Sequence, residues 1–529
     1  MPTLEWIGKE KVINHHQEVP FRVLDRQYSF DENGQHTEDN GSENMIIHGD
    51  NLDALKALLP RYEGRVKCIY IDPPYNTGNE GWVYNDNVND PKIRKWLGEV
   101  VGKEGEDLSR HDKWLCMMYP RLKLLQKLLA EDGAIFISID DVEFYNLRLI
   151  CNEVFGEHNF IATIIWRKNY APKSTAKHFS EDHDYILVFG KNADNWIPHK
   201  MPRTEKQNKA YKNFDNDPRG LWRPNNLAAR NYYSKGTYSI KCPGGRIIEG
   251  PPSGSYWRVS EEKFWELDRD GRIWWGRDGN NVPAPKIFLS EVSDGIVPQT
   301  FWPYEEVGHT QDAKKEIKAI FGGDMPFDTP KPVRLIERIL QIASDPDSII
   351  LDSFAGSGTT AHAVLNMNKA DGGNRKFILV EMMDYADSIT AERVRRVIRG
   401  YGEGKSAVEG TGGSFSYYEL GEPLLIGENL NEAVAPEKIR EYIWFMETKT
   451  PYTPAAGDNP YYLGKHNDTG YYFYYEPQRI TVLDYDYLAA VTEKAGGTVI
   501  YADRCSIDDD KLSQMGIVFK KIPRDISRL

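Results

Sequence analysis

The sequence predicts an α/β protein built on a mainly parallel, doubly wound sheet, with an inserted domain and a small C-terminal α+β domain. The chain has 529 residues, and at about 150 residues per domain this length allows several domains. Short apolar runs alternate with amphipathic segments on both sides of the middle of the chain, a pattern typical of βα repeats with a parallel sheet. Between residues 192 and 310 that alternation is lost, and a glycine-rich stretch at 402–414 precedes the last part of the chain.

In the first half, short apolar runs indicate strands and apolar spacings of three or four residues indicate helices. The polar stretch 29–44 is expected to be a loop. Gly133 is expected to end the second helix. The elements expected are strands at 45–48, 68–72, 133–140, 160–166 and 184–189, and helices at 52–59 and 114–130.

The same alternation resumes after the insert, so the insert interrupts one α/β domain. We expect a helix at 333–343, a strand at 348–352, a helix after Gly358 and a strand at 376–381. Strands expected near the end lie at 471–475, 480–483, 498–501 and 517–520. The predicted division is an N-terminal extension (1–44), a main domain (45–192 and 311–401), an inserted domain (193–310) and a C-terminal domain (415–529).

Charge and composition narrow the function. The chain has 66 Lys and Arg against 79 Asp and Glu, a net charge of −13, which argues against coating of a polyanion along its whole length. Residues 200–250 nevertheless hold eleven Lys and Arg and only four Asp and Glu. This basic stretch is a candidate nucleic-acid surface, or a solvated, loop-rich domain with ordinary core aromatics. The candidate contacts are Arg223, Arg230, Lys235, Lys241 and Arg246.

The five cysteines are scattered and contain no C-x-x-C, so we expect neither a disulfide framework nor a thiolate zinc site. The first ten residues lack the pattern of a signal peptide, and no apolar run approaches the roughly 20 residues that span a bilayer. We therefore predict a cytoplasmic protein that needs no metal.

A glycine-rich turn lies between a predicted strand and a predicted helix, in the sequence LDSFAGSGTT at 351–360. Backbone can approach a ligand closely there, and helix N–H groups face it. The spacing Gly356-x-Gly358-x-x-Ala361, with Glu381 twenty residues further on, also fits a dinucleotide fingerprint, so a nicotinamide-dependent oxidoreductase stays open at this point. A phosphate-binding P-loop fits worse, because Thr359 stands where that loop requires Lys.

A second motif, Asp72-Pro73-Pro74-Tyr75, directly follows the strand expected at 68–72. Open α/β sheets bind ligands at such carboxyl-terminal strand ends. Asp72 and the Pro73 carbonyl could accept the two N–H groups of an exocyclic amine, while Tyr75 stacks on the base that carries it. The plainer interpretation is that Pro73 and Pro74 provide only a rigid exit from the sheet.

Together these motifs resemble the amino-group DNA methyltransferases that depend on S-adenosyl-L-methionine, in the permuted beta class. The resemblance implies a Rossmann-like methyltransferase fold, with Asp72, Pro73, Pro74 and Tyr75 as the catalytic motif and an inserted target-recognition domain. It also implies that Asp50 contacts the donor's adenine, that Glu381 contacts its ribose, and that residues 329–332 close over its methionine end. The implied donor-binding residues are Asp50, Asn51, Lys331, Asp352, Phe354, Ala355, Gly356, Gly358, Thr359 and Glu381.

Longer stretches are similar to the modification subunit of type III restriction systems: IIHGDNLDAL, IYIDPPYNTGN, GAIFISIDD and EDHDYILVFGKN. This resemblance implies methylation of adenine N6 in double-stranded DNA, with the base flipped out of the helix. It further implies a homodimer that binds an ATP-dependent restriction subunit, with the C-terminal domain pairing subunits or docking that partner. Alternatives are an orphan methyltransferase, and methylation of cytosine N4 or of an RNA amino group. A silent specificity subunit would not need both motifs intact.

Overall fold

The computed structural model describes residues 3–77, 95, 98–100, 109–293, 295–455 and 459–524. The chain forms two compact units, one made of Met1–Pro198 together with Gln299–Leu529 and the other of His199–Pro298. Within the described ranges, no helix combines the length and the apolar composition needed to cross a bilayer. The cytoplasmic location stays a prediction.

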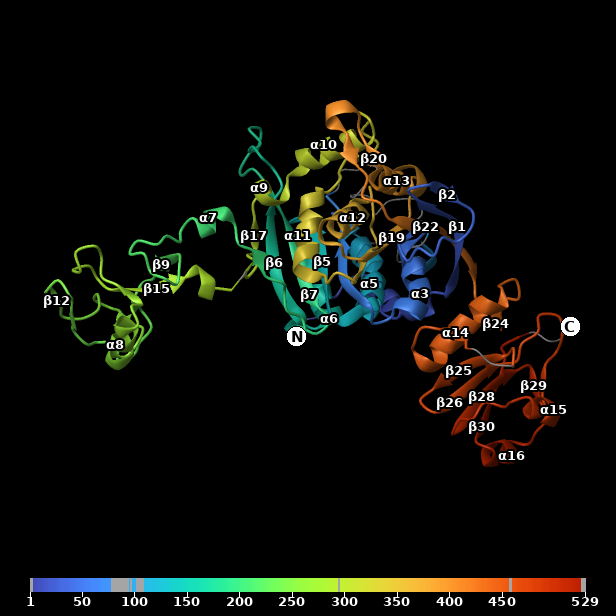
Figure 1. The fold of residues 1–529 in the computed structure, drawn as a ribbon. Coiled ribbons are helices and arrows are strands. Elements are labelled where there is room, and N and C mark those ends of the chain that lie inside the picture. Colours follow the sequence, from blue (N-terminus) through green and yellow to red (C-terminus); the bar gives the residue numbers. More distant parts are fainter. Residues whose placement is uncertain are drawn as a thin grey trace. The chain divides into compact units, whose positions relative to one another are not determined.

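The larger unit is organised around one mixed sheet (Figure 1). Six adjacent strands, β5, β4, β18, β19, β3 and β22, run parallel to one another. Strand β7 is antiparallel to β5 and β6, and β1 is antiparallel to β22 and β2. This confirms the predicted mainly parallel sheet. From edge to edge the strands are β17 (Phe301–Trp302), β6 (Phe160–Arg167), β7 (His183–Gly190), β5 (Leu129–Ile139), β4 (Val66–Ile71), β18 (Ile349–Asp352), β19 (Lys376–Glu381), β3 (Met45–His48), β22 (Ser414–Pro423), β1 (Arg22–Asp31) and β2 (Gly34–His36).

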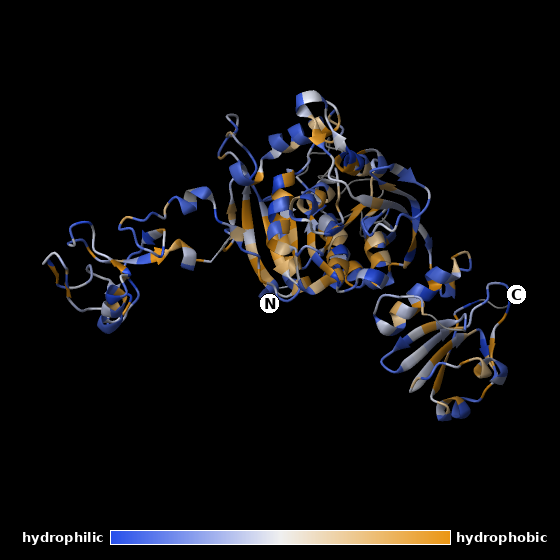
Figure 2. Ribbon diagram, viewed as in Figure 1, coloured by the Kyte–Doolittle hydropathy of each residue, from blue (hydrophilic) through white to orange (hydrophobic). Residues whose placement is uncertain are grey.

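Helices cover both faces of this sheet, so the fold is doubly wound. Helices α3 (Asn51–Tyr62), α5 (Arg110–Leu128) and α6 (Phe144–Phe155) pack on one another and share an apolar core with alternate strand residues. Helix α12 (Thr359–Asp371) packs on α11 (Val333–Ala343) and on α13 (Glu392–Arg399). Figure 2 shows the hydrophobic residues concentrated on the central strands and on the helix faces turned toward them. Shorter helices are α1 (Lys9–Val12), α2 (His15–Glu18), α9 (Tyr304–Val307) and α10 (Thr310–Ile320).

The direction of winding reverses between β4 and β18. From β4 the chain passes through α5 to β5 on one side, and from β18 it passes through α12 to β19 on the other. The two strands are nevertheless paired, with Ile350 opposite Cys68 and Leu351 opposite Ile69. A reversal of this kind opens a crevice at the carboxyl ends of the two strands, which is where open α/β sheets bind ligands.

Most predicted elements match the structure to within a few residues, and the elements at 45–48, 333–343 and 376–381 match it residue for residue. The predicted role of Gly133 is wrong. Helix α5 ends at Leu128 and β5 begins at the next residue. Gly133 lies inside β5 at an irregularity in the pairing with β4, where a Cβ would come within 2.9 Å of the Val66 and Lys67 carbonyl oxygens. Close approach of backbone therefore requires this glycine.

A predicted loop and a predicted domain boundary are also wrong. The stretch 29–44 is not simply a loop, since it contains the end of β1 and all of β2. Strand β22, assigned to the C-terminal domain from residue 415 on, pairs with β3 and with β1 in the central sheet. Residues 1–44 and the segment after 414 therefore both contribute strands to the main sheet. Their polar residues belong to strands near the edge of the sheet, where side chains can reach solvent.

The smaller unit, His199–Pro298, has its own apolar core, which includes Trp257, Phe264 and Trp275. It is narrower than the predicted insert 193–310, because β17, α9 and α10 belong to the larger unit. Its elements are β8 (Met201–Pro202), α7 (Glu205–Asn208), β9 (Trp222–Pro224), β10 (Ala228–Ala229), β11 (Ile240–Lys241), β12 (Ile247–Ile248), β13 (Tyr256–Trp257), α8 (Glu261–Arg269), β14 (Ile273–Trp274), β15 (Ala284–Phe288) and β16 (Gly295–Ile296).

The C-terminal segment forms a separate four-stranded sheet in the order β25-β26-β28-β30, as expected for a small α+β domain. These strands span Tyr462–His466, Thr469–Phe473, Gly497–Ala502 and Ile517–Lys521. The remaining elements of this part of the chain are β20 (Gly400–Tyr401), β21 (Val408–Glu409), β23 (Leu425–Ile426), β24 (Asn429–Leu430), α14 (Pro436–Thr448), β27 (Val482–Leu483), α15 (Tyr485–Ala489), β29 (Arg504–Cys505) and α16 (Asp509–Gln514).

Candidate active site

Asp72 lies immediately after β4, at the crevice where the winding reverses. Its side chain is largely buried, and Lys331 Nζ donates a hydrogen bond to its Oδ2 at 2.5 Å. The turn after Asp72 is fixed by Trp114, whose Nε1 donates to the Pro74 carbonyl at 2.6 Å. Pro73 and Pro74 have no N–H to donate, and their rings restrict the backbone further. The carboxylate is therefore presented from a rigid segment.

Tyr75 lies beside Asp72 as a half-buried ring. Lys331 Nζ is 5.0 Å from the ring centroid, and the tyrosine hydroxyl lies 3.5 Å from Asp184 Oδ2 on β7. Asp184 is itself buried and accepts a hydrogen bond from Lys168 Nζ at 2.5 Å. Burial, followed by the negative charges of Asp184 and Asp72, raises the pKa of Tyr75 well above its ordinary value. The ring is therefore neutral and available as a flat stacking surface.

The glycine-rich turn follows β18 on the other side of the crevice. Asp352 Oδ1 accepts from the Phe354 backbone N–H at 3.0 Å, and its Oδ2 accepts from Thr360 Oγ1 at 2.5 Å. Burial raises the pKa of Asp352 from 3.8 to about 7. The Ala355 N–H donates to the Val380 carbonyl at 3.1 Å, which ties the turn to β19.

The two glycines of this turn have positive φ angles, 53° at Gly356 and 79° at Gly358. Such angles favour glycine strongly. A Cβ on Gly358 would also lie 3.0 Å from the Thr390 carbonyl oxygen. Thr359 begins α12, and its hydroxyl lies 3.3 Å from the Lys331 carbonyl oxygen. The turn thus reaches toward the segment that carries Lys331.

Glu381 is the last residue of β19, and its side chain accepts hydrogen bonds from the backbone of the turn and of the segment after β19. Its Oε2 accepts from the Gly356 N–H at 2.8 Å, and its Oε1 accepts from the Met383 N–H at 2.9 Å. Burial raises the pKa of Glu381 from 4.5 to about 7. The structure therefore places Glu381 against the glycine-rich turn, while its contact with a ribose stays a prediction.

Asp50 and Asn51 reach the same region from the start of α3. Asp50 caps that helix, accepting from the Leu52 N–H at 2.7 Å, and also accepts from Arg121 Nη2 at 3.0 Å. Asn51 accepts from Arg121 Nε at 2.5 Å and donates through Nδ2 to the Ser353 carbonyl at 2.8 Å. The Asp50–Asn51 pair is thereby joined to the residue that precedes Phe354.

A small pocket lies between Asp72, the glycine-rich turn and residues 329–331, and its polar lining fits a ligand. The Thr329 hydroxyl on its wall is buried and has no hydrogen-bond partner among the described residues. A buried hydroxyl of this kind normally finds a partner. Its lining residues are Tyr70, Asp72, Phe327, Thr329, Pro330, Lys331, Asp352, Phe354, Ala355, Gly356, Ser357, Thr359 and Thr360. In the described part of the chain no group of three His, Cys, Asp or Glu side chains could hold a metal ion.

Arg121 and Arg393 are buried charges beside this site that sequence reasoning missed. A usable signal existed for Arg121. It lies on the apolar face of α5, spaced like Trp114, Met118 and Leu125, and a charge in such a position must be paired inside the protein.

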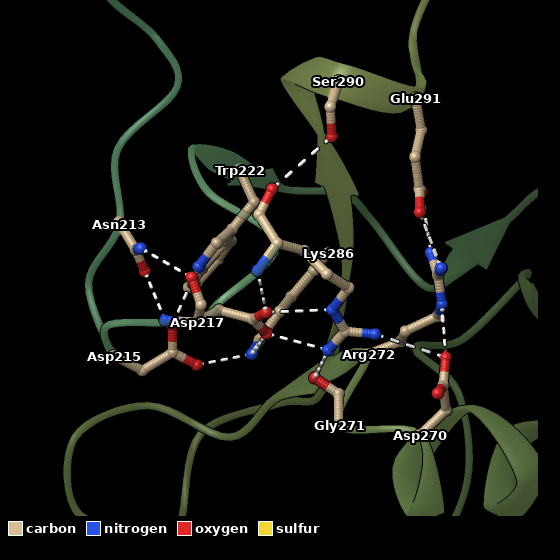
Figure 3. A network of polar contacts seen from close by, with 11 residues as sticks. Asn213, Asp215, Asp217, Trp222, Asp270, Gly271, Arg272, Lys286, Ser290 and Glu291 are labelled. Atoms are coloured by element: carbon tan, nitrogen blue, oxygen red, sulfur yellow. Dashed lines mark hydrogen bonds and ion pairs between the residues drawn. The ribbon is translucent and has the colours of Figure 1, made fainter.

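The five basic candidates in the smaller unit differ from its other cations. Arg223, Arg230, Lys235, Lys241 and Arg246 are all exposed, and no carboxylate of the described chain forms an ion pair with them. By contrast, Arg219 forms an ion pair with Asp217. Arg272 and Lys286 are held in the same network of Asp and Glu side chains (Figure 3). Hydrogen bonds from Arg219 hold the pKa of Asp217 well below its usual value. The network neutralises these three cations within the unit, whereas the five exposed cations remain available to an anion.

Residues 66–392 match the DNA methylase family, which covers more than half of the chain. The chain belongs to the DNA methylase family. The chain is 36% identical over 68% of its length to the Type III restriction-modification enzyme StyLTI Mod subunit of Salmonella typhimurium, covering 58% of that protein. It is 32% identical over 72% of its length to the EcoPI Mod subunit of Escherichia phage P1, covering 63% of it.

A third relative is the EcoP15I Mod subunit of Escherichia coli, with 30% identity over 75% of this chain and 66% of the relative. The chain thus spans roughly three fifths of the length of the curated relatives it matches. Among solved structures, the PvuII DNA methyltransferase (cytosine-N4-specific) aligns with 66% of this chain and 86% of its own, at 13% identity and a TM-score of 0.34.

Proposed function

We propose that this chain transfers a methyl group from S-adenosyl-L-methionine to the N6 amino group of adenine in a short DNA sequence, as the modification subunit of a type III-like restriction-modification system. One observation carries the proposal. Asp72–Tyr75 and the turn 352–359 are far apart in sequence, yet they follow two paired parallel strands at the point where the winding reverses. An acceptor amine and a methyl donor must meet at such a place.

The donor site is supported by the polar groups around the glycine-rich turn. S-adenosyl-L-methionine supplies an electrophilic methyl group when it is bound. Glu381 offers a carboxylate to the ribose, and Asp50 offers one on the side of the adenine. The glycines at 356 and 358 allow close approach of the backbone, and the buried Thr329 hydroxyl offers a further hydrogen bond. Donor-binding roles are also proposed, from their positions around the glycine-rich turn and at the start of α3, for Asn51, Lys331, Asp352, Phe354, Ala355 and Thr359. The proposed reaction requires no metal.

The acceptor site is supported by Asp72 and Tyr75. An adenine must leave the duplex to reach Asp72, which costs a few kcal/mol, and the ring of Tyr75 can stack on it. Asp72 and the Pro73 carbonyl then accept hydrogen bonds from the two N–H groups of the amine and orient the nitrogen lone pair toward the methyl group. Since Lys331 Nζ already lies on Asp72 Oδ2, the arriving amine must compete with the ammonium group for this carboxylate. Positioning of the two reacting groups is the main contribution of the protein.

Adenine is favoured over cytosine because Asp72 begins the catalytic motif, where the resemblance implies Ser in enzymes that act on cytosine N4. The similarity to three Mod subunits supports the same choice. A nicotinamide-dependent enzyme is disfavoured by chain order, because most of the strands of the sheet precede the glycine-rich turn.

Three further roles extend the proposal. The smaller unit reads the DNA sequence, because its five exposed cations can contact phosphates and base edges. A homodimer and an ATP-dependent restriction subunit are the proposed partners, and the C-terminal segment is their proposed contact. The cytoplasm is the proposed location.

The test is sequencing of individual genomic DNA molecules from a methylation-free bacterial host that expresses the chain, compared with its Asp72→Ala variant. We expect N6-methyladenine at one short motif, and a loss of at least about 100-fold in the variant, the size of effect typical for removal of one group that stabilises the transition state. Because Asp72 serves the acceptor, the purified variant should still bind the donor.

Several outcomes would contradict parts of the proposal. N4-methylcytosine in place of N6-methyladenine would refute the adenine assignment. Modified RNA with unmodified DNA would refute the DNA substrate. Failure of the folded wild-type protein to bind S-adenosyl-L-methionine would refute methyl transfer itself, and equal loss of donor binding and transfer in Asp72→Ala would refute the assigned role of Asp72.

A further inference from the structure

Arg393 is a fully buried cation beneath the glycine-rich turn. It lies on α13 and is 0% exposed. Its Nη1 donates to Ser357 Oγ at 2.9 Å and to Thr359 Oγ1 at 2.8 Å, and its Nη2 lies 3.2 Å from His362 Nδ1. Burial lowers the pKa of Arg393 from 12.5 to about 10, so the guanidinium stays charged at neutral pH. A full positive charge is therefore kept out of water at this point.

No carboxylate of the described residues balances that charge at ion-pair distance. His362 cannot do so, because burial and the charge of Arg393 lower its pKa well below the ordinary value and keep it neutral. Glu316 is the acid that acts on Arg393 at longer range, but its Oε2 accepts from the Val333 N–H at 3.0 Å. Buried charges are normally paired, so an anion from outside the chain would complete this arrangement.

The hydrogen bonds fix the direction in which the charge acts. Arginine can only donate, so both hydroxyls accept from Arg393 and must point their own protons elsewhere. Thr359 Oγ1 donates its proton to the Lys331 carbonyl oxygen at 3.3 Å, and Ser357 Oγ lies 3.2 Å from Thr359 Oγ1. Ser357 and Thr359 both line the pocket beside Asp72. The Ser357 hydroxyl, which accepts from Arg393, can therefore offer its own proton to an acceptor in this pocket, above all a carboxylate.

The position of the Ser357 hydroxyl identifies the anion. Glu381 and Asp50 mark the ribose and adenine end of the proposed donor site, and the methyl group must lie at Asp72. The amino-acid end of the donor therefore extends beyond Asp72, into the pocket lined by Ser357, Thr359 and residues 329–331.

We propose that Arg393 is a positioning residue for the carboxylate of the methyl donor, acting through the hydroxyl of Ser357. The inference rests on the proposed function and adds to it the residue that supplies the balancing charge. Hydrogen bonds to a charged group are about twice as strong as neutral ones. The bond from the Ser357 hydroxyl to the carboxylate would therefore make the protein prefer a donor that carries a carboxylate.

The test compares two ligands that differ only in that group. Dissociation constants for S-adenosyl-L-methionine and for its decarboxylated form are measured calorimetrically, without DNA, on the full chain. We expect wild-type protein to prefer the carboxylated ligand by about tenfold or more, the effect of a hydrogen bond to a charged group. Arg393→Met should reduce this preference to within about twofold, with little change for the decarboxylated ligand. Arg393→Lys should restore part of the preference, and Ser357→Ala should lower it.

Arg399→Met is the matched control. This arginine lies on the same helix but is exposed and sits over the Phe30 ring, so its variant should keep the wild-type preference. Thermal unfolding establishes that each variant is folded. Arg393→Met that keeps the wild-type preference, or that weakens both ligands equally, would overturn the proposal. Should Arg393→Met fail to fold, a folded Ser357→Ala with wild-type preference would overturn it instead. Failure of wild-type protein to bind either ligand would contradict the proposed function rather than this inference.

Discussion

Glu381 and Asp352 have pKa values of about 7 in the folded protein because both are buried. Ribose hydroxyls can donate to an ionised Glu381, so donor binding favours the carboxylate form. We expect donor affinity to be constant above about pH 8 and to weaken below pH 7, by up to about tenfold per pH unit. Calorimetric titrations from about pH 5.5 to about pH 8.5 measure this, and Glu381→Gln should flatten most of the dependence.

The folding stability of the protein should depend on pH in the opposite direction to the donor affinity. The pKa of each group is raised in the folded state, so the unfolded chain binds fewer protons between the ordinary values and pH 7. Their contribution to folding stability is therefore largest at acid pH and is lost as pH rises through about 7. Donor affinity that falls on the alkaline side, in parallel with stability, would contradict the role of Glu381.

The residues of the site differ in how far the sequence reveals them. Asp72–Tyr75 and the turn 352–359 are contiguous motifs at strand ends, so their places in the fold follow from local patterns. Arg121 and Arg393 contact residues 70 and 36 positions away along the chain. No spacing rule links such partners, and only a charge on an apolar helix face indicates that one exists.

At the scale of elements, strand pairing explains why the predicted boundaries fail. Periodicity predicts the buried central strands well, because both of their faces are apolar. Strands β1 and β22 carry many polar residues, and their partners lie almost four hundred residues apart, as in the pairing of Ser29 with Ser416. Local sequence contains no information about such a partner, so neither strand is predicted: β1 falls within the predicted N-terminal extension, and nearly all of β22 falls within the predicted C-terminal domain.

The place of β22 in the main sheet yields a prediction about stability. Phe415 is fully buried and stacks on Phe30 of β1 at 5.6 Å. Phe415→Ala should destabilise the main sheet, which carries the proposed donor site, by about 3–5 kcal/mol, and lower its melting temperature by about 10 °C. Thermal unfolding with and without S-adenosyl-L-methionine identifies the transition that belongs to this sheet.

Phe473→Ala is the matched control, since Phe473 is equally buried but lies in β26 of the C-terminal sheet. Its variant should leave the transition that responds to the donor nearly unchanged. If Phe415→Ala spared that transition while Phe473→Ala lowered it, β22 would not belong functionally to the donor-binding sheet.

At the scale of the whole molecule, the proposed methyl transfer and the proposed DNA recognition lie in different compact units. Asp72, the glycine-rich turn and their supports all lie in the larger unit, while the five exposed cations lie in His199–Pro298. The smaller unit also has its own apolar core and ion-pair network. A unit that is stable by itself can change its surface without disturbing the site where the methyl group is transferred.

Exchange of residues 199–298 for the corresponding unit of a related methyltransferase should therefore change the methylated DNA motif and leave donor affinity within about twofold, because the smaller unit has its own apolar core. The boundary matters. An exchange of 193–310 would also replace β17, which pairs with Ile165 and Trp166 of β6, and we expect that chimera to be less stable. Sequencing of methylated DNA and donor titration measure the two effects separately. A folded 199–298 chimera that methylates the original motif would place sequence recognition in the larger unit, and a chimera that loses donor binding would show that the two units do not act independently.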